Sequence, residues 1–476
     1  MEPSTPGCPR CRELEAIVAD LQRKIGVLAQ VCEAQQREIE ELKARLGSDS
    51  SNSSRPPSAD SPYAKPRLKK KPSKRKPGGQ PGHPGSHRAL LDVTEVDHVE
   101  RLFPHNCDAC DHELPQVPDG DPKRKQVSEI PPVAPEVTEY QFFAVVCPHC
   151  GRRTVATASP DVPKGSFGPR AEATAIYLQG AAHLSVRETQ RAFADLFGFP
   201  ISIGALSRIA QRATGALEPS YTEALDAVRG APVVHADETP WYLRGALSWL
   251  WFAGTETLRV FKVDPRRTIN ARRRFLGSEL HGLLVADRYV AYDEQPIGRR
   301  QFCLAHLKRD AKALVARGGE AKAFGERLLE LLRSAFAQWR AFRDAHRDRG
   351  LMRMRLRPTW QKLVELLVEG AESDHDRVAN FSAHLILKGE AMWTFTEVEG
   401  CPPTNNLAEQ SLRKPVLWRK SSLGSQSEWG CRFVERILSI VESLRAQRRD
   451  ILPFLVDAMN AFTQGRAPPS ILPLAR

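Results

Sequence analysis

The sequence contains no long hydrophobic run and no secretory leader, and each absence excludes a class of protein. The longest apolar stretches, such as ALSWLWFAG, are far shorter than the roughly 20 residues that cross a bilayer. The first residues, MEPSTPGCPRC, lack the charged and apolar regions of a signal peptide. We therefore expect a soluble protein of the cytoplasm with no membrane partner.

Acidic residues are too few to balance the basic ones. The 476 residues include 69 Lys and Arg against 57 Asp and Glu, which gives a net charge of +12. Such an excess fits a polyanionic partner, nucleic acid first, although many basic proteins only expose solvated basic faces. The length suits about three domains.

Cysteine is also scarce, yet six of the ten cysteines fall in three C-x-x-C pairs. In a reducing compartment this spacing favours metal binding over disulfides. Two of the pairs, Cys107 with Cys110 and Cys147 with Cys150, flank the strand-like segment EVTEYQFFAVV. They predict a zinc ribbon over residues 97–157, whose four thiolates form a closed, structural zinc site.

Apolar residues recur at alternating steps of four and three from residue 14 to residue 46, without a proline. The resulting seam is Leu14, Val18, Leu21, Ile25, Leu28, Cys32, Gln35, Ile39, Leu42 and Leu46. Leucine dominates one seam position and β-branched residues lead the other, which favours a parallel two-stranded coiled coil over 12–47. The alternative is a helix packed on its own domain. Cys8 and Cys11 lie beside it as free thiols or as a metal pair shared by two chains.

Residues 48–96 are rich in Ser, Pro and Gly, which predicts a disordered linker. A dense cationic block lies within it: Lys65, Arg67, Lys69, Lys70, Lys71, Lys74, Arg75 and Lys76. Such a block can neutralise DNA phosphates without reading sequence. A merely solvated basic tail is the alternative.

Residues 165–220 have the pattern of an all-helical domain. Pro169 suits a first helical turn, Ser185 and Glu188 form a capping box that opens a second helix, and Ser202 caps a third. Two short helices around a tight turn indicate a helix-turn-helix-like DNA-binding domain. The candidate DNA contacts are Ser207, Arg208, Gln211 and Arg212. Helix pairs of this kind also occur in proteins that never touch DNA.

Two apolar runs, PVVHAD and GLLVAD, end in Asp237 and Asp287. The strands and helices around them alternate as in an α/β sheet, where active residues usually lie at strand ends. Two carboxylates on adjacent strands repel each other, which raises the pKa of one of them. A Mg²⁺ ion bound by both removes this repulsion. Two-metal phosphodiester chemistry usually needs a third carboxylate, and Glu409, on the helix opened by PPTNNLAEQSLRK, is the obvious donor.

Acids at strand ends are often only turn residues or helix caps, and Glu238, Asp264 and Asp293 are nearby competitors. Three cations follow Glu409 as candidate contacts to the DNA backbone: Arg413, Arg419 and Lys420. Between the second aspartate and Glu409, apolar stripes predict a helical insertion at about 312–398. One stripe comprises Phe324, Leu328, Leu331, Ala335, Trp339 and Phe342. Residues 446–476 are expected to form a C-terminal helical tail.

These motifs, in this order, resemble those of the large transposase of the insertion-sequence-66 family, a DDE-type enzyme with a ribonuclease-H-like core. The similar segments are HADETPW, VADRYVAY, CLAHLKRD and NNLAEQSLR, together with SSRPPSAD and GGQPGHPG in the linker and the two C-x-x-C pairs. The resemblance implies Asp237, Asp287 and Glu409 as catalytic residues and Mg²⁺ or Mn²⁺ ligands in a domain over 231–445. Thr404, Gln410 and the segment LWRKSSLGS depart from the family pattern.

The resemblance implies a multidomain DNA transposase of the bacterial cytoplasm, associated with the nucleoid, that cuts element ends and joins their 3′-hydroxyls to target DNA. Its implied partners are double-stranded DNA, further copies of the chain through the coiled coil, and small accessory proteins of the same element. Two alternatives remain: a nuclease of the same fold without joining, and a DNA-binding regulator with inert acids. Cys303 and His306 of CLAHLKRD have metal-ligand spacing, and whether they bind metal is left open.

Overall fold

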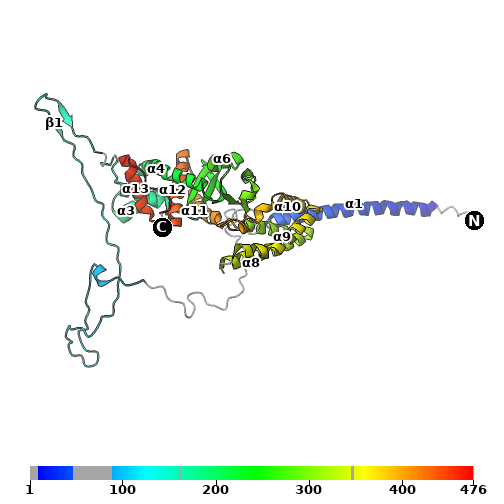
Figure 1. The fold of residues 1–476 in the computed structure, drawn as a ribbon, viewed down its shortest axis with the longest axis horizontal. Helices are drawn as coiled ribbons and strands as arrows, with labels where there is room; N and C mark the ends of the chain where they lie inside the picture. Colours follow the sequence, from blue (N-terminus) through cyan, green and yellow to red (C-terminus); the bar gives the residue numbers. More distant parts are fainter. Residues whose placement is uncertain (1–8, 47–87, 160–161, 164, 345–347, 475–476) are drawn as a thin grey trace, which may run out of the picture.

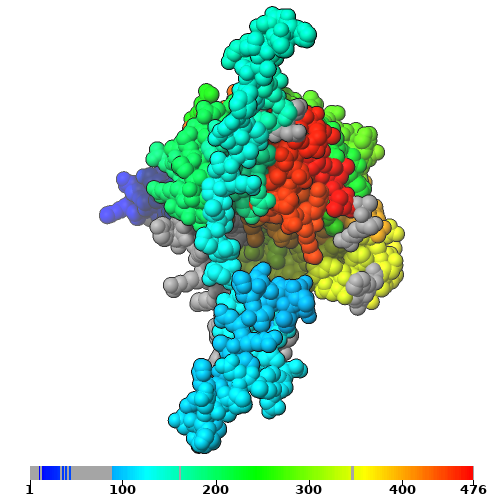
Figure 2. Space-filling model, turned by 90° about the vertical axis from the view of Figure 1, so that its left-hand side faces the viewer, coloured from blue at the N-terminus to red at the C-terminus, as the bar shows by residue number. Residues whose placement is uncertain are grey.

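The computed structural model describes residues 9–46, 88–159, 162–163, 165–344 and 348–474. The basic block at 65–76 and Cys8 lie outside the described residues. Figure 1 shows a long helix, an extended segment that we call the arm (88–159), and a body of helices around a sheet (165–344 and 348–474). Figure 1 shows the arm extending away from the body, and in the view of Figure 2 the arm passes in front of the body. In the described part of the chain, no helix combines the length and apolar character that crossing a membrane requires.

The long helix α1 spans Pro9–Leu46 and confirms the helix expected from the heptad pattern. Its apolar seam is open to solvent, with Ile39 44% and Ile25 64% exposed. A continuous apolar seam is stable in water only when another surface covers it. Pairing of two such helices stays a prediction, because the described structure contains a single chain.

The arm contains little regular structure. Its antiparallel strands, β1 (Ala144–Val146) and β2 (Arg153–Val155), are three residues long, and a short 3₁₀ helix, η2, spans Val93–Glu95. Only the last three residues of EVTEYQFFAVV form a strand, so the expectation of a strand over the whole segment was wrong. Residues 136–143 are exposed and pair with no strand among the described residues.

The body is built on a five-stranded sheet with the order β5-β4-β3-β6-β7. The strands are β3 (Val233–Leu243), β4 (Ala246–Gly254), β5 (Arg259–Asp264), β6 (Leu283–Ala286) and β7 (Arg300–Phe302). The first three are antiparallel neighbours, whereas β6 runs parallel to β3 and β7 parallel to β6. Arg244 and Gly245 connect β3 to β4 with φ angles of 51° and 77°, as the tight two-residue hairpin turn requires.

Helices cover the sheet. Before the sheet lie α2 (Pro169–Gly180), α3 (Val186–Phe197), α4 (Ile203–Ala216) and α5 (Glu218–Arg229). Within and after it come α6 (Ile269–Leu276), α7 (Leu304–Val315), α8 (Gly319–Asp344), α9 (Arg349–Ala371), α10 (Asp376–Leu387), α11 (Asn406–Ser422), α12 (Glu428–Gln447) and α13 (Ile451–Gln464). Four 3₁₀ turns, η3 (Val290–Tyr292), η4 (Ile297–Arg299), η5 (Gly389–Met392) and η6 (Thr394–Thr396), complete the body.

One hydrophobic core joins helices that precede the strands of the sheet in the sequence to a helix that follows them. Phe454 and Ala458 of α13 belong to the same buried cluster as Ile176 of α2 and Ile209 of α4, and α13 packs on α2 and α4. The expected boundaries at 220 and 446 are therefore corrected, because the helical domain and the predicted tail bury one shared core instead of packing separately.

A second hydrophobic core lies in the segment where the helical insertion was expected. Phe324, Leu328 and Ala335 of α8 are buried together with residues of α7, α9 and α10. The same cluster includes Val285 of β6 and Phe302 of β7. The insertion is therefore packed against β6, which precedes the second aspartate, and β7, which follows it.

Both edges of the sheet are covered by side chains or backbone. On the β5 side, Glu435, Ser439 and Ser443 of α12 accept hydrogen bonds from the backbone N–H groups of alternate β5 residues, at 2.7, 2.9 and 2.8 Å. Four residues of an α-helix advance about 6 Å along its axis, and two residues of a strand advance about 6.7 Å. Every fourth residue of α12 can therefore meet every second residue of β5. On the β7 side, Gln301 exchanges hydrogen bonds with the backbone of Met392 and Phe395.

Candidate active site

Asp237 and Asp287 lie at the same level on neighbouring parallel strands. The β3–β6 register pairs Val233 with Leu283 and His235 with Val285, a constant separation of 50 positions. The same register, continued by two residues, aligns Asp237 with Asp287. Since residues at one level of parallel neighbours face the same side about 4.8 Å apart, the two carboxylates share one face of the sheet.

The side chain of Asn405 fixes the start of α11 to β3. It is fully buried, and its Nδ2 donates to the backbone oxygen of Ala236 at 2.7 Å. Its Oδ1 accepts from His235 Nδ1 at 3.0 Å. Ala236 immediately precedes Asp237, so these bonds bring the first turn of α11, which carries Glu409, to the first aspartate. The expectation that this helix lies across the sheet is confirmed, since α11 packs on β3 and β4.

The electrostatics of the two aspartates reflect this proximity. Burial, followed by the charges of Glu238 and Asp287, raises the pKa of Asp237 well above its usual value, and Glu409 adds to the rise. Burial also raises the pKa of Asp287. Each accepts a backbone N–H, from Glu238 and Tyr289 respectively, at 2.9 Å. Neither forms an ion pair with any described residue.

The three competing acids are held by cations. Glu238 accepts from Arg267 Nε at 2.6 Å and from the Tyr292 hydroxyl at 2.5 Å. Asp264 binds the guanidinium of Arg274.

Asp293 contacts Arg300 and Lys388, each at 2.7 Å. Because these ion pairs occupy the competitors, Asp237 and Asp287 remain the acids available to a cation on this part of the sheet.

Glu409 has a different environment from the two aspartates. Its Oε1 accepts from Arg309 Nη2 at 2.9 Å and lies 3.9 Å from His306 Nδ1. Among the described residues, the three side chains whose ligand atoms all lie within 4.8 Å of one another are Cys303, His306 and Glu409. Asp237, Asp287 and Glu409 are neighbours but do not meet this criterion.

The chemistry of the two aspartates fits a divalent cation. Burial raises the pKa of both carboxylates, and the charge of Asp287 adds to the rise at Asp237, so the ionised forms of these unpaired groups are destabilised. Oxygen ligands of this kind are those that Mg²⁺ and Mn²⁺ prefer. Glu409 lies close enough for its charge to act on Asp237, while its Oε1 is held by Arg309.

The candidate DNA contacts on α11 divide into two kinds. Arg413 and Lys420 are exposed. Arg419 is only 8% exposed and donates to the backbone oxygen of Pro240 and to Thr239 Oγ1. Its predicted contact with DNA is therefore corrected: Arg419 holds α11 on β3.

The helix-turn-helix-like pair has the expected helices and caps. Ser185 Oγ accepts from Glu188 N at 3.1 Å, but the Glu188 side chain pairs with Arg191 instead of completing the capping box. Arg208 and Gln211 are exposed and Ser207 is partly buried.

Arg212, by contrast, forms an ion pair with the buried Glu172 of α2. This pair ties α4 to α2 within the body. Arg208 therefore remains the exposed basic candidate on α4, and the assignment of Arg212 to DNA is weakened.

The two C-x-x-C pairs of the arm form similar local turns. Cys107 N donates to His112 O, and Cys147 N donates to Arg152 O, each at 2.9 Å. In each turn, backbone N–H groups near the second cysteine lower the pKa of the first thiol. The four thiols are not gathered into one group in the described structure, so the zinc ribbon stays a prediction.

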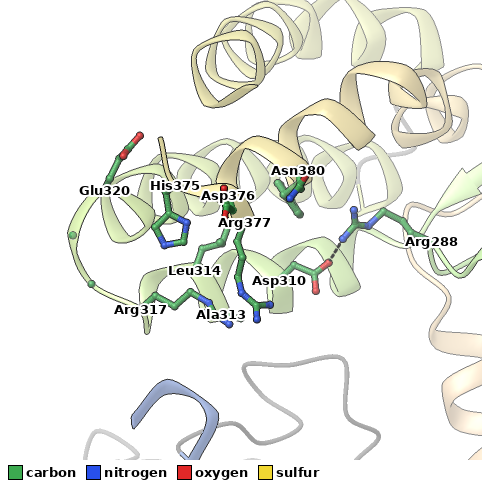
Figure 3. Close-up of a pocket in the computed structure, with 13 residues that line it drawn as sticks. Arg288, Asp310, Ala313, Leu314, Arg317, Glu320, His375, Asp376, Arg377 and Asn380 are labelled. Atoms are coloured by element: carbon green, nitrogen blue, oxygen red, sulfur yellow. Dashed lines mark hydrogen bonds and ion pairs between the residues drawn. The ribbon is translucent and has the colours of Figure 1, made fainter. Parts of the chain in front are cut away.

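An open cavity of about 1000 Å³ lies beside the second aspartate (Figure 3). It is lined by residues of α7, the α7–α8 turn and α10, and by Arg288, which follows Asp287 and donates to Asp310 at 2.6 Å. Arg317 and Arg377 also line it. Its lining also includes the acids Asp310, Glu320 and Asp376, so the cavity beside Arg288 carries charges of both signs.

Sequence reasoning missed several residues that build this site. Asn405 was part of a quoted motif but had no role, and His235 and Arg267 had none either. A buried amide is invisible in the sequence until its partners are known. The signals available were the polar doublet immediately before the helix of Glu409 and the histidine two residues before Asp237.

The sheet, the paired aspartates and the adjoining helix that carries Glu409 define a mixed α/β protein with a carboxylate site suited to divalent cations. Residues 164–432, more than half of the chain, match the family model described as Transposase IS66 family. The chain belongs to this family of transposases. Residues 1–89 match a family of unknown function (DUF6444). A comparison with curated proteins found no match.

Proposed function

We propose that this chain is a DNA transposase that cleaves the ends of an insertion sequence and joins the 3′-hydroxyls to target DNA. Asp237, Asp287 and Glu409 are its catalytic residues. The observation that carries the proposal is the β3–β6 register, which places the two aspartates side by side, next to the helix of Glu409. The family membership of the chain supports it independently.

The catalytic domain is ribonuclease-H-like in this proposal. Its support is a sheet of three antiparallel strands followed by two parallel ones, with β3 in the centre. The first aspartate lies on that central strand and the second follows its parallel neighbour. The helical insertion and α11 then complete the domain around the carboxylates.

Asp237 and Asp287 would hold one Mg²⁺ or Mn²⁺ between them, and Glu409 would complete a second position. Bound there, the ions supply activation of the attacking oxygen and stabilisation of the leaving oxygen in phosphodiester chemistry. The residues of the chain have separate tasks. Arg309 restrains Glu409, and Arg267 keeps Glu238 out of the site.

DNA contacts are proposed on several basic surfaces. Arg413 and Lys420 are exposed on the helix of Glu409. Arg208 on α4 and the basic block of the linker would add contacts to phosphates, whose number sets affinity and salt dependence. The exposed seam of α1 supports assembly of two or more chains, so that both element ends are processed together.

Structural zinc is proposed for the arm. Each C-x-x-C turn presents two thiols, and backbone N–H groups lower the pKa of the first thiol in each, which favours the thiolate that zinc requires. Closing the four-cysteine site needs the two turns to come together. The small accessory proteins of the element remain expected partners whose role the chain does not specify.

The test is an assay of cleavage and joining on labelled element-end DNA. The full-length protein, with its accessory proteins, is assayed with Mg²⁺ or Mn²⁺ beside Asp237→Asn, Asp287→Asn and Glu409→Gln. Each variant should lose about a thousandfold or more in cleavage while still binding DNA. Glu279→Gln is the matched control, because Glu279 is half exposed and pairs with Arg299 on the surface.

The outcomes separate the rival functions. Joined products from the wild-type protein, lost in the three variants, support the transposase. Cutting without joining would instead identify a nuclease. Binding without any cutting, even with the accessory proteins present, would identify a regulator and overturn the proposal.

A further inference from the structure

The side chains of Cys303, His306 and Glu409 converge at the start of α7. Their ligand atoms lie within 4.8 Å of one another, and His306 Nδ1 is 3.9 Å from Glu409 Oε1. Cys303 is buried, and the His306 side chain is 15% exposed. His306 Nδ1 is buried without a hydrogen-bond partner among the described residues, so an acceptor nitrogen faces this point unused.

The backbone holds the three side chains in place from two distant segments. Cys303 is the N-cap of α7, and His306 lies in its first turn. Leu304 N donates to Pro403 O at 2.9 Å, and Asn405 N donates to Cys303 Sγ at 3.1 Å. The loop that opens the helix of Glu409 is therefore bonded directly to the turn that carries the thiol and the imidazole.

The surroundings of Cys303 suit a metal-bound thiolate. Burial, with the charge of Glu409, raises the pKa of its thiol to about 11, and the backbone N–H groups of Asn405, His306 and Ala305 oppose this rise. The sulfur also lies at the N-terminus of a 12-residue helix, where the helix dipole favours negative charge. Donors of this kind stabilise a thiolate once a cation replaces its proton.

We propose that Cys303, His306 and Glu409 form a zinc site with three protein ligands and one open position. Thiolate, imidazole and carboxylate are ligands of Zn²⁺, whereas Mg²⁺ takes oxygen ligands and avoids thiolates. Atoms bound to one tetrahedral zinc at 2.0–2.3 Å lie about 3.5 Å apart. The separations in the structure require only a small closure.

A second consequence rests on the proposed catalytic function. Glu409 is shared, so a zinc ion on Cys303 and His306 withdraws a carboxylate oxygen from Asp237 and Asp287. Zinc and the catalytic cation then compete for Glu409. Arg309 opposes zinc as well, because its guanidinium occupies Glu409 Oε1 at 2.9 Å and must release it.

Binding is tested with Co²⁺ as a spectroscopic probe and Zn²⁺ as its competitor. The reference protein for these measurements, called the parent, is the full chain with serine in place of all six C-x-x-C cysteines. These are Cys8, Cys11, Cys107, Cys110, Cys147 and Cys150. It should bind one Co²⁺ with a thiolate charge-transfer band that Zn²⁺ abolishes. Cys303→Ser should lose the band, and His306→Gln should weaken binding at least about tenfold.

Two further variants sharpen this test. Arg309→Gln should tighten Co²⁺ and Zn²⁺ binding, because it removes the competing cation from Glu409. Cys401→Ser is the matched control: Cys401 is also buried, lies just before the Glu409 loop and does not belong to the group, so the band should persist. Thermal unfolding verifies that each variant is folded. A parent without the band, or a band unchanged in both Cys303→Ser and His306→Gln, overturns the site.

Competition is tested by titrating Zn²⁺ into the Mn²⁺-dependent cleavage reaction, with each rate expressed relative to that of the same variant without zinc. The wild-type protein should be inhibited at a Zn²⁺ concentration at least about tenfold lower than His306→Gln. Equal sensitivity of the two, despite binding of Co²⁺ to the parent, overturns the sharing of Glu409. If the wild-type protein never cleaves DNA, the proposed function fails, and the Co²⁺ spectrum still decides the zinc site.

Discussion

The carboxylate site on the sheet and the cysteine turns of the arm are assembled in opposite ways. Asp237, Asp287 and Glu409 come from three separate segments, held by strand register and by the buried Asn405. Each C-x-x-C pair is instead shaped by a turn of a few residues. The strands β1 and β2, which flank the second pair, are three residues long. The first site is built by the core of the body. The second depends on a ligand to join its halves.

This difference separates two sources of order. In the body, burial of apolar residues fixes side chains whose charges repel each other. In the arm, most side chains are exposed, so little hydrophobic free energy is available, and binding of the proposed zinc ion would add to it. The site on the sheet should therefore tolerate loss of metal in its fold, whereas the arm should not.

The largest expected effect is the loss of order in the arm when zinc is removed. A chelator, or Cys147→Ser, should make residues 97–157 sensitive to protease, because zinc binding and folding are coupled in such sites. The unfolding transition of the body should stay unchanged. Limited proteolysis with and without added zinc, together with thermal unfolding, measures both. If the arm resists protease equally without zinc, its order has another source and the comparison breaks.

The next effect is expected from Asn405→Ala. The substitution removes two buried side-chain hydrogen bonds and leaves their partners unsatisfied, which should lower the free energy of unfolding by about 2–3 kcal/mol. Cleavage should fall as well, since α11 loses its anchor beside Asp237. Asn406→Ala is the control, because Asn406 is the exposed neighbour. Urea unfolding compares the two, and equal losses would show that the anchor does not hold the site.

A smaller effect, a gain in stability instead of a loss, is expected from Asp237→Asn in the absence of divalent cations. The pKa of Asp237 is raised in the folded state, so the wild-type protein loses stability as the pH rises from the unfolded value of about 3.9 through that raised value. The variant escapes this loss. Its unfolding temperature should exceed that of the wild-type protein by a few degrees at neutral pH, and the difference should vanish toward pH 4.

Two controls accompany that measurement. Mg²⁺ should stabilise the wild-type protein more than Asp237→Asn, because the carboxylate repulsion is the quantity that the cation relieves. Asp264→Asn should destabilise the body, since Asp264 is 4% exposed and bound to Arg274. A destabilised Asp237→Asn at neutral pH would argue against repulsion at the proposed metal site.

The smallest effect is expected from Arg413→Ala. Loss of one exposed phosphate contact should weaken DNA binding by about 1 kcal/mol for all sequences and reduce the salt slope by about one. The unfolding temperature should not change. Arg419→Ala on the same helix should lower the unfolding temperature and leave the salt slope of DNA binding unchanged, because Arg419 is buried against β3. Binding titrations at several salt concentrations distinguish them, and equal effects on binding would contradict the division of α11 into two faces.

Local patterns predicted most of the elements of the body. The apolar run ending in Asp287 predicted β6, and Ser185 and Ser202 marked helix starts that the structure confirms. The expectation that a strand ends at Asp237 was wrong, because β3 continues through Pro240 to Leu243. In the arm, EVTEYQFFAVV has the composition of a strand, but its first eight residues belong to no strand in the described structure. Composition reports the preference of a segment, whereas pairing depends on another part of the chain.

The same limit explains the errors at the level of sites and domains. Arg419 and Arg212 looked like free cations because their partners, Pro240 and Glu172, are 179 and 40 positions away. The boundary expected at 446 failed because α13 completes a core with α2, near the other end of the body. Exposed positions such as Arg208 and Arg413 were easier to place, since they need no internal partner.

The ladder of α12 side chains along β5 has a consequence for how copies of this protein can meet. Backbone groups at an unprotected sheet border recruit strands from other molecules and start aggregation. Here Glu435, Ser439 and Ser443 already occupy the outward N–H groups of β5, and Gln301 links β7 to its neighbours. Crowding many copies onto one DNA molecule therefore should not fuse their sheets, and association is left to helical surfaces that can separate again.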